Sequence, residues 1–240
     1  MTQPANTLTI CVATMSSEAH PDVVTWQEHA SHKSLDVQYW YNTSENLGVV
    51  GAYQKLYEQV QSDVLLFLHD DAICREPEWD LRLMAEFIDD PQTAVVGFGG
   101  ALWHGLPELY KVPYQLQQLQ RGQYRSNVDD AEVHGERFTG RCRVAVLDGF
   151  ALAVRRSFLD RIGGFAKISA MGIDFINYDY TICALARRYG YKIRMVGVRC
   201  HHRGGVTSTK LGIDWQPSYV RAHEVFYNNF RDVMPCKVHP

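Results

Sequence analysis

Residues 63–71, with the sequence DVLLFLHDD, hold a continuous apolar run that ends in one histidine and two aspartates. A short apolar run of this kind is typical of a buried strand. Residues 49–60 before it carry apolar side chains at helical spacing, which predicts a helix that leads into the strand. In α/β folds, ligands bind beyond the carboxyl ends of the strands. His69, Asp70 and Asp71 therefore lie where a binding site is expected.

Strands and helices alternate along the chain on both sides of this stretch. Strands are predicted at residues 8–13, 35–40, 94–98 and 192–198, and helices at residues 23–31, 79–90, 155–162, 179–189 and 217–234. Gly190 stands where a glycine commonly ends a helix. We expect an α/β fold with a mostly parallel central sheet flanked by helices, an irregular insertion and a C-terminal helix.

The segment between these regions has a different character. Residues 103–142 are rich in Gln, Tyr, Arg and Gly and show little periodicity, which predicts a long surface excursion. Loops of that length are usually functional or mobile, so we expect substrate specificity there. Trp103, close to Gly99 and Gly100, is expected to stack on a sugar or a base at the mouth of the cleft. The aromatic face of residues 217–234 is expected to bury against its own domain.

The composition is that of a folded protein of one domain. With 240 residues, 46% of them hydrophobic and 21% charged, the chain lies outside the disordered, collagen-like and coiled-coil classes. It holds no apolar stretch approaching about 18 residues, and its N-terminus lacks the features of a signal peptide. The six cysteines are scattered, without a C-x-x-C pair. We expect a cytoplasmic protein with reduced thiols.

The charges are distributed unevenly along the chain. Residues 1–100 hold four Lys and Arg against fifteen Asp and Glu, whereas residues 101–240 hold twenty against twelve. One interpretation is an anionic partner for the basic part, and the other is that the two halves neutralise each other across an internal interface.

Several short motifs along the chain become informative as a set. In chain order they are Asn46-x-Gly48, Phe67-Leu68-His69-Asp70-Asp71, Asp148-Gly149-Phe150 with Arg155-Arg156, Gly163-Gly164-Phe165, Tyr178-Asp179, Ala186-Arg187-Arg188-x-Gly190-Tyr191 and His201-His202-x-Gly204-Gly205. Together, over about residues 8–205, they resemble the family 2 glycosyltransferases of the GT-A (Rossmann-like) fold, in particular small stand-alone bacterial and phage-type members. The resemblance implies transfer of a sugar from a nucleoside-diphosphate sugar to an acceptor hydroxyl.

The resemblance also implies a metal site for Mn²⁺ or Mg²⁺. Asp71 corresponds to the last acid of the family's Asp-x-Asp motif, whose ion bridges the two phosphates of the donor, while His69 stands at the first acid's position. Asp70 is expected to turn toward the sugar or ribose, because neighbouring side chains of an extended chain point to opposite faces. His201 or His202 corresponds to the family's late histidine ligand, with His201 preferred.

Catalytic and nucleotide-binding roles follow from the same resemblance. Tyr178-Asp179 corresponds to a Glu-Asp pair at a helix start, so Asp179 is the expected general base of an inverting reaction, with Asp174 in reserve. Asp148 is expected to contact the acceptor or the donor sugar. The base and ribose are expected near Ala13, Met15, Asn42 and Asn46, and Arg203 is expected to add a positive contact. UDP is the first donor nucleotide expected, from its frequency in the family.

The resemblance further implies a division of labour within one domain, residues 1–240. Residues 1–100 form the nucleotide-binding half and residues 101–240 the acceptor-binding and catalytic half. The expected acceptor is a glycan or lipid-linked saccharide, with a hydroxylated nucleic-acid base also possible because arginines are frequent around residues 121–143. The alternative is a catalytically inert GT-A domain that binds a sugar nucleotide or glycan, since His69 and Tyr178 replace acids of the family. The oligomeric state stays open.

Overall fold

A seven-stranded sheet forms the centre of the molecule. The computed structural model describes residues 7–32, 34–43, 45–105, 121–129, 135–204 and 215–239. The strand order is β2 (Asp36–Tyr41), β1 (Leu8–Thr14), β3 (Val64–His69), β11 (Ala151–Arg155), β5 (Thr93–Gly97), β12 (Lys192–Val196) and β9 (Arg141–Arg143). All of these strands except β11 and β9 run parallel to one another. The prediction of a mostly parallel α/β sheet is confirmed.

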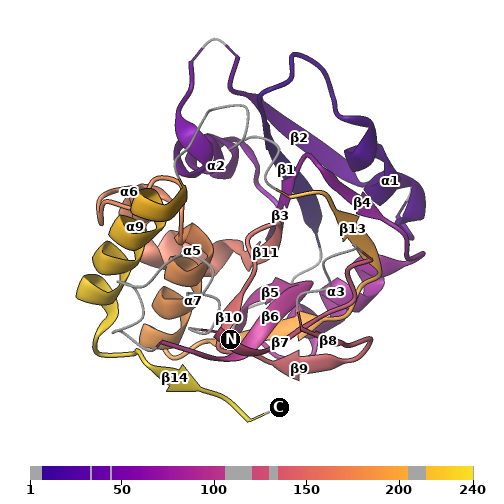
Figure 1. Ribbon diagram of the computed structural model, residues 1–240. Helices are drawn as coiled ribbons and strands as arrows, with labels where there is room; N and C mark the ends of the chain where they lie inside the picture. The colour runs from indigo at the N-terminus through magenta and orange to yellow at the C-terminus, as the bar shows by residue number, and fades with distance from the viewer. Residues whose placement is uncertain are drawn as a thin grey trace.

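Helices cover both faces of this sheet (Figure 1). One face carries α1 (Pro21–His29) and α3 (Trp79–Ile88), and the other carries α2 (Gly48–Gln59), α5 (Arg156–Ile162), α6 (Ala166–Ser169), α7 (Tyr178–Arg188) and α9 (Trp215–Phe230). Side chains of strand β3 alternate between the two cores. Leu66 packs in the core that contains Trp26 and Trp79, whereas Phe67 packs in the core that contains Tyr53. This alternation explains why the strand is apolar along its whole length.

Local signals mark the ends of the helices. Pro21 opens α1, where a missing backbone N–H costs nothing, and the His20 side chain accepts a hydrogen bond from the Asp22 amide. After α7, Gly190 takes a left-handed φ of 77° that most other residues avoid. The predicted helix end at Gly190 is confirmed.

The prediction of an irregular excursion over residues 103–142 is wrong for much of the described part. Strands β6 (Gly99–His104), β7 (Arg121–Ser126), β8 (Glu136–Arg137) and β10 (Val146–Leu147) form a second sheet, which β14 (Cys236–Lys237) joins through β6. Three of these strands, β8, β10 and β14, have two residues each, so local periodicity does not reveal them. Residues 106–120 and 130–134 of the segment lie outside the described residues.

A short two-stranded ribbon joins the segment after β3 to the segment that holds His201 and His202. Strand β4 (Ala72–Cys74) follows the acids after β3, and it pairs in antiparallel register with β13 (Cys200–His202). The register sets His202 opposite Ala72. The late histidines therefore lie beside the end of β3.

Ion pairs join the acidic first part of the chain to the basic second part. Arg141 lies 3.2 Å from Glu86, and Arg194 and Lys192 lie 3.1 Å and 2.7 Å from Asp90. Arg141 also pairs with Asp89, and Arg194 with Glu86. These contacts support the interpretation in which the two halves neutralise each other. They also leave fewer cations of the second half for an anionic partner.

The C-terminal helix packs against its own domain, as expected. His223, Phe226, Tyr227 and Phe230 of α9 are all buried.

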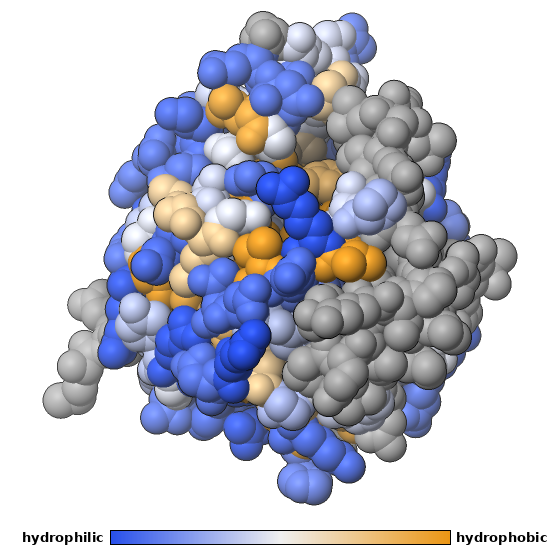
Figure 2. Space-filling model, turned by 60° about the vertical axis from the view of Figure 1, so that its left-hand side comes forward, coloured by the Kyte–Doolittle hydropathy of each residue, from blue (hydrophilic) through white to orange (hydrophobic). Residues whose placement is uncertain are grey.

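Within the described ranges, none of the helices has the length and hydropathy that a membrane crossing needs. The face shown in Figure 2 is mostly hydrophilic where it is described, with small separate hydrophobic areas. All six cysteines lie among the described residues, and none of them is in a disulfide bond.

Candidate active site

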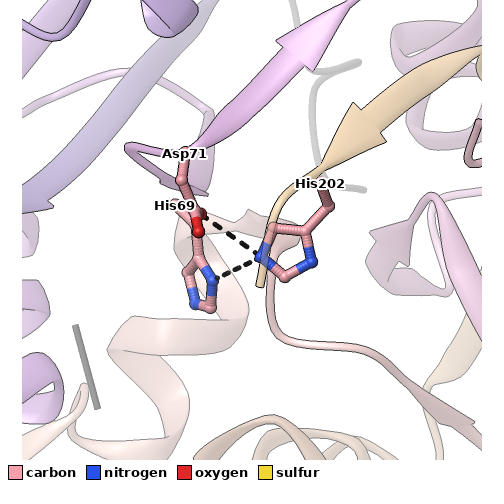
Figure 3. A group of neighbouring side chains, drawn as sticks. All are labelled: His69, Asp71 and His202. Carbon is pink, nitrogen blue, oxygen red and sulfur yellow. Dashed lines mark hydrogen bonds and ion pairs between the residues drawn. The ribbon is translucent and has the colours of Figure 1, made fainter. Parts of the chain in front are cut away.

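Three side chains that can ligate a metal meet at the carboxyl end of strand β3 (Figure 3). They are His69 at the end of β3, Asp71 just before β4, and His202 at the end of β13, and we call them the His–Asp–His cluster. His202 Nε2 lies 3.3 Å from Asp71 Oδ1 and 3.3 Å from His69 Nδ1. All three ligand atoms lie within 4.8 Å of one another. The arrangement can hold one divalent cation.

The electrostatics of the cluster suit metal binding. Burial, together with the charge of His202, lowers the pKa of His69 to about 4. Burial alone would raise the pKa of Asp71, but the hydrogen bond and charge of His202 outweigh it, so this pKa lies below its usual range. At neutral pH the site therefore offers a neutral imidazole and a carboxylate, the forms in which these groups ligate metals.

Contacts from Tyr178, Gly149 and Phe150 hold the two histidines of the cluster in place. His69 Nε2 lies 2.9 Å from the hydroxyl of Tyr178, and that hydroxyl donates a hydrogen bond of 2.8 Å to the Gly149 carbonyl. The Phe150 ring stacks on His202, with ring centroids 4.9 Å apart. A Cβ at position 149 would lie 2.5 Å from the Tyr178 hydroxyl oxygen, so only glycine allows this approach. The Asp-Gly-Phe motif thus supports both histidines.

The two expected catalytic carboxylates lie around this support. Asp148 accepts hydrogen bonds from the Phe150 amide at 3.4 Å and from the Tyr124 hydroxyl at 3.3 Å. Asp179 lies in the first turn of α7, where the helix dipole favours a carboxylate, and its Oδ1 accepts from the Tyr180 amide at 2.8 Å. The Cβ of Asp179 would lie 3.3 Å from a Cβ at position 149. Asp179 is therefore adjacent to the loop that holds the cluster.

Asp174, the reserve candidate for the general base, has a different environment. It is exposed, and its carboxylate accepts a hydrogen bond of 2.6 Å from the Ser169 hydroxyl. Its backbone carbonyl faces the start of α2. These contacts are typical of a residue that shapes a loop.

Asp70 and Asp71 point to different partners, although the two residues lie in the turn between β3 and β4 and not on an extended chain. Asp70 Oδ2 accepts a hydrogen bond of 2.5 Å from the hydroxyl of Thr14, at the end of β1, whereas Asp71 contacts His202. Ala13 of β1 pairs in register with His69. The ends of β1 and β3 therefore form one continuous edge beside the cluster.

Three further residues expected near the nucleotide lie after strands β1 and β2. Met15 is 37% exposed. Asn42 is buried, and its Oδ1 accepts hydrogen bonds from Trp40 Nε1 and from the Leu47 amide. Asn46 Oδ1 accepts from the Gly48 amide at 3.0 Å. Both asparagines shape the loop that enters α2, which gives them a structural role whether or not they contact a nucleotide.

The structure separates the two late histidines. His202 joins the cluster, whereas His201 Nδ1 lies 2.7 Å from the Asp129 carbonyl oxygen, so the geometry does not support the preference for His201. Arg203 forms an ion pair of 3.1 Å with Asp22 at the start of α1. Sequence reasoning placed His69 with the nucleotide and gave Tyr178 no role. The signal for both was their place in motifs where the family has acids.

Comparison with known proteins gives a family match. The family model described as Glycosyl transferase family 2 matches residues 22–148, more than half of the chain. A search of the curated proteins finds no significant match.

Several solved glycosyltransferases share the fold at low sequence identity. GalNAc-T7 with UDP, GalNAc and Mn²⁺ has a TM-score of 0.56 at 14% identity, over 95% of this chain and 50% of that chain. Glucosyl-3-phosphoglycerate synthase from Mycobacterium tuberculosis, with Mg²⁺ and UDP, has a TM-score of 0.54 at 11% identity, over 94% and 79%. The mannosyltransferase PcManGT from Pyrobaculum calidifontis, with GDP-Man and Mn²⁺, has a TM-score of 0.52 at 13% identity, over 98% and 69%.

These neighbours have the GT-A architecture seen here, although the chain spans only half the length of GalNAc-T7. The family match includes strand β3, two members of the cluster and the Asp148 position. The protein therefore belongs to glycosyl transferase family 2 and has a GT-A fold.

Proposed function

We propose that this protein transfers a sugar from a nucleoside-diphosphate sugar to an acceptor hydroxyl, with a divalent cation held by the His–Asp–His cluster. The observation that carries the proposal is the meeting of His69 and His202, 133 positions apart in the chain, with Asp71 at the carboxyl end of β3. Ligands of α/β sheets bind at this edge. The solved neighbours named above were crystallised with UDP or GDP-Man and with Mn²⁺ or Mg²⁺, which supports this donor class.

The residues of the cluster fit a divalent cation. Two imidazole nitrogens and one carboxylate oxygen are common ligands of Mn²⁺ and related ions, and the atoms are close enough to share one ion. When bound, such an ion neutralises the negative charge that develops on the departing diphosphate. Of the donor nucleotides, UDP is the first to test, followed by GDP.

Asp179 is the proposed general base. As the acceptor oxygen attacks the anomeric carbon, its proton moves to the Asp179 carboxylate and the bond from that carbon to the diphosphate oxygen breaks. Attack opposite the leaving group inverts the configuration. The Tyr180 amide holds one carboxylate oxygen of Asp179 and thereby fixes its orientation. Asp148, held by Tyr124 and Phe150, is proposed to contact the sugar.

The acceptor is proposed to be a saccharide or lipid-linked saccharide. Ion pairs between the two halves of the chain use several of the cations that would otherwise favour a nucleic acid. Residues 1–100 would bind the nucleotide, since strands β1 and β3 end side by side next to the cluster. Residues 101–240 would supply the base and the acceptor contacts.

A donor screen followed by a base variant tests this proposal. Nucleoside diphosphates and their sugars are added with Mn²⁺, and the one that raises the unfolding temperature is used in a hydrolysis assay. Asp179→Asn should keep donor binding and lower turnover by about 10²- to 10⁴-fold. The matched control, Asp174→Asn, should keep its activity.

The donor screen, together with a DNA-binding assay, separates the alternative functions. Donor binding without turnover in the wild-type protein, unchanged in Asp179→Asn, would favour a catalytically inert binding domain. A salt-dependent shift of duplex DNA, falling steeply as salt rises, would favour a nucleic-acid acceptor.

A further inference from the structure

Two replacements in the motifs contact each other in the structure. His69 and Tyr178 each stand at a position where the family that this chain resembles has an acid. The two residues are 109 positions apart in the chain. The His69 Nε2 atom and the Tyr178 hydroxyl oxygen lie 2.9 Å apart. Tyr178 is adjacent to Gly149, whose missing side chain leaves room for the hydroxyl, and the His69 amide donates to the carbonyl of the next residue, Phe150. The two replacements therefore form one structural unit.

The hydrogen bonds of the Tyr178 hydroxyl indicate which ring nitrogen of His69 has a free lone pair for a cation. The Tyr178 hydroxyl has one proton, which it donates to the Gly149 carbonyl. With this proton on the Gly149 carbonyl the hydroxyl accepts toward His69, and we infer that His69 Nε2 carries the proton. A neutral imidazole has one N–H, so the lone pair is on Nδ1. That nitrogen lies 3.3 Å from His202 Nε2.

We propose that His69 is a direct third ligand of the cation and that Tyr178 is the positioning residue that fixes its tautomer and orientation. The site would then prefer cations that accept imidazole nitrogen, such as Mn²⁺ and Co²⁺, over Mg²⁺, which prefers oxygen ligands. This inference deepens the proposed function, because it concerns the cation of the same site. It needs no transfer activity to be tested.

The distances within the cluster agree with direct ligation. Ligands at about 2.0 to 2.2 Å from one ion and at right angles are about 3 Å apart. The two separations from His202 Nε2, both 3.3 Å, are close to that value. A metal-bound histidine usually donates its other N–H to a fixed acceptor, and the Tyr178 hydroxyl has this place toward His69.

Nitrogen ligation can be counted on the full chain with Mn²⁺ alone. Pulsed electron paramagnetic resonance of bound Mn²⁺ should detect two directly coordinated imidazole nitrogens in the wild type and one in His69→Asp. His201→Ala is the matched control, because it removes the neighbouring imidazole of the same strand, and it should keep both nitrogens. One nitrogen in the wild type, or two in His69→Asp, would overturn the proposal.

Selectivity and positioning give independent readouts. Added Mg²⁺ should displace Mn²⁺ poorly from the wild type and readily from His69→Asp, where an acid replaces the imidazole. Tyr178→Phe should weaken Mn²⁺ binding by about 10- to 100-fold, whereas Tyr180→Phe, which removes a hydroxyl from a buried tyrosine of the same helix, should not. Equal Mn²⁺ affinity in both tyrosine variants would contradict the role of Tyr178 in positioning His69.

The outcomes remain separable from those for the proposed function. Two-nitrogen Mn²⁺ binding without donor turnover would leave this inference standing and contradict the enzyme proposal. Donor turnover with only one nitrogen on the ion would contradict this inference and the place of His69 among the ligands, while sugar transfer itself would stand. Should His69→Asp fail to fold, as judged by circular dichroism, the wild-type nitrogen count and Tyr178→Phe still decide.

Discussion

Replacing Gly149 by alanine is expected to disturb the metal cluster without touching any ligand. The new Cβ would lie 2.5 Å from the Tyr178 hydroxyl oxygen and 2.8 Å from its Cζ, and both distances are shorter than real Cβ contacts. Tyr178 is only 6% exposed, so it has little room to retreat. Overpacking of this kind costs about 1 to 3 kcal/mol of unfolding free energy. Any retreat of Tyr178 also changes its contact of 2.9 Å with His69.

Two measurements on Gly149→Ala follow from this geometry. The unfolding temperature should fall by about 2 to 4 °C for each kcal/mol lost, as expected for a chain of this size. Affinity for Mn²⁺, measured by titration calorimetry, should fall by about 10- to 100-fold, the usual effect of losing a hydrogen bond that orients a metal ligand.

Gly190→Ala is the matched control for Gly149→Ala. Gly190 has a left-handed φ of 77°, and a Cβ there would meet nothing within 4 Å, so alanine adds only backbone strain of about 1 to 2 kcal/mol. This variant should lose a similar amount of stability and keep its Mn²⁺ affinity. If Gly149→Ala loses stability but binds Mn²⁺ like the wild type, the coupling of Tyr178 to the cluster is refuted.

Three further predictions concern a ligand, a buried cation and a buried acid. Asp71→Asn should abolish the rise in unfolding temperature that Mn²⁺ gives with the nucleotide; a wild-type rise would contradict its place as a ligand. Arg155→Met should destabilise the fold by about 1 to 3 kcal/mol for each carbonyl left unpaired, because the buried guanidinium donates to the backbone oxygens of Thr93 and Phe87; denaturant unfolding measures the loss. Burial acts to raise the pKa of Asp80, but hydrogen bonds from two backbone amides and an imidazole lower it overall. Its contribution to stability is therefore present above its unfolded pKa and lost as pH falls through the lower folded pKa. Asp80→Asn should cost unfolding free energy at neutral pH and progressively less in acid, and a difference independent of pH would contradict this.

The central strands could be predicted from the sequence because their signals are local. Strand β3 is apolar along its length, and the helices before and after it have clear periodicity and ends. The second sheet could not be predicted in this way. Strands such as β8 and β10 have two residues each, and their hydrogen bonds are to partners that only the tertiary fold brings near.

The candidate site was predictable in its parts and less so in its geometry. Sequence order indicated Asp71 and a late histidine, but His201 and His202 have the same side chain and alternate across one strand. Only the pairing of β13 with β4 decides which of them faces Asp71. The contact between His69 and Tyr178 depends on how α7 packs beside β3, and no local pattern in the sequence contains that information.

The charge distribution shows the same limit. The contrast between the acidic and basic parts of the chain is plain from the sequence, but its meaning depends on which charges meet. Asp90 lies beside both Lys192 and Arg194, more than a hundred positions away, which indicates internal neutralisation. An anionic acceptor therefore has less support from charge alone.

Nucleotide binding with and without the cation tests the central claim most directly. Binding of UDP and GDP is measured by titration calorimetry in Mn²⁺ and after chelation, on the wild type, His202→Ala and His201→Ala. We expect one of the nucleotides to bind the wild type and His201→Ala only in Mn²⁺, and His202→Ala to bind it weakly in both conditions. Two results would contradict a cation site built from His69, Asp71 and His202. One is a nucleotide affinity that chelation does not change, and the other is binding that is lost in His201→Ala and kept in His202→Ala.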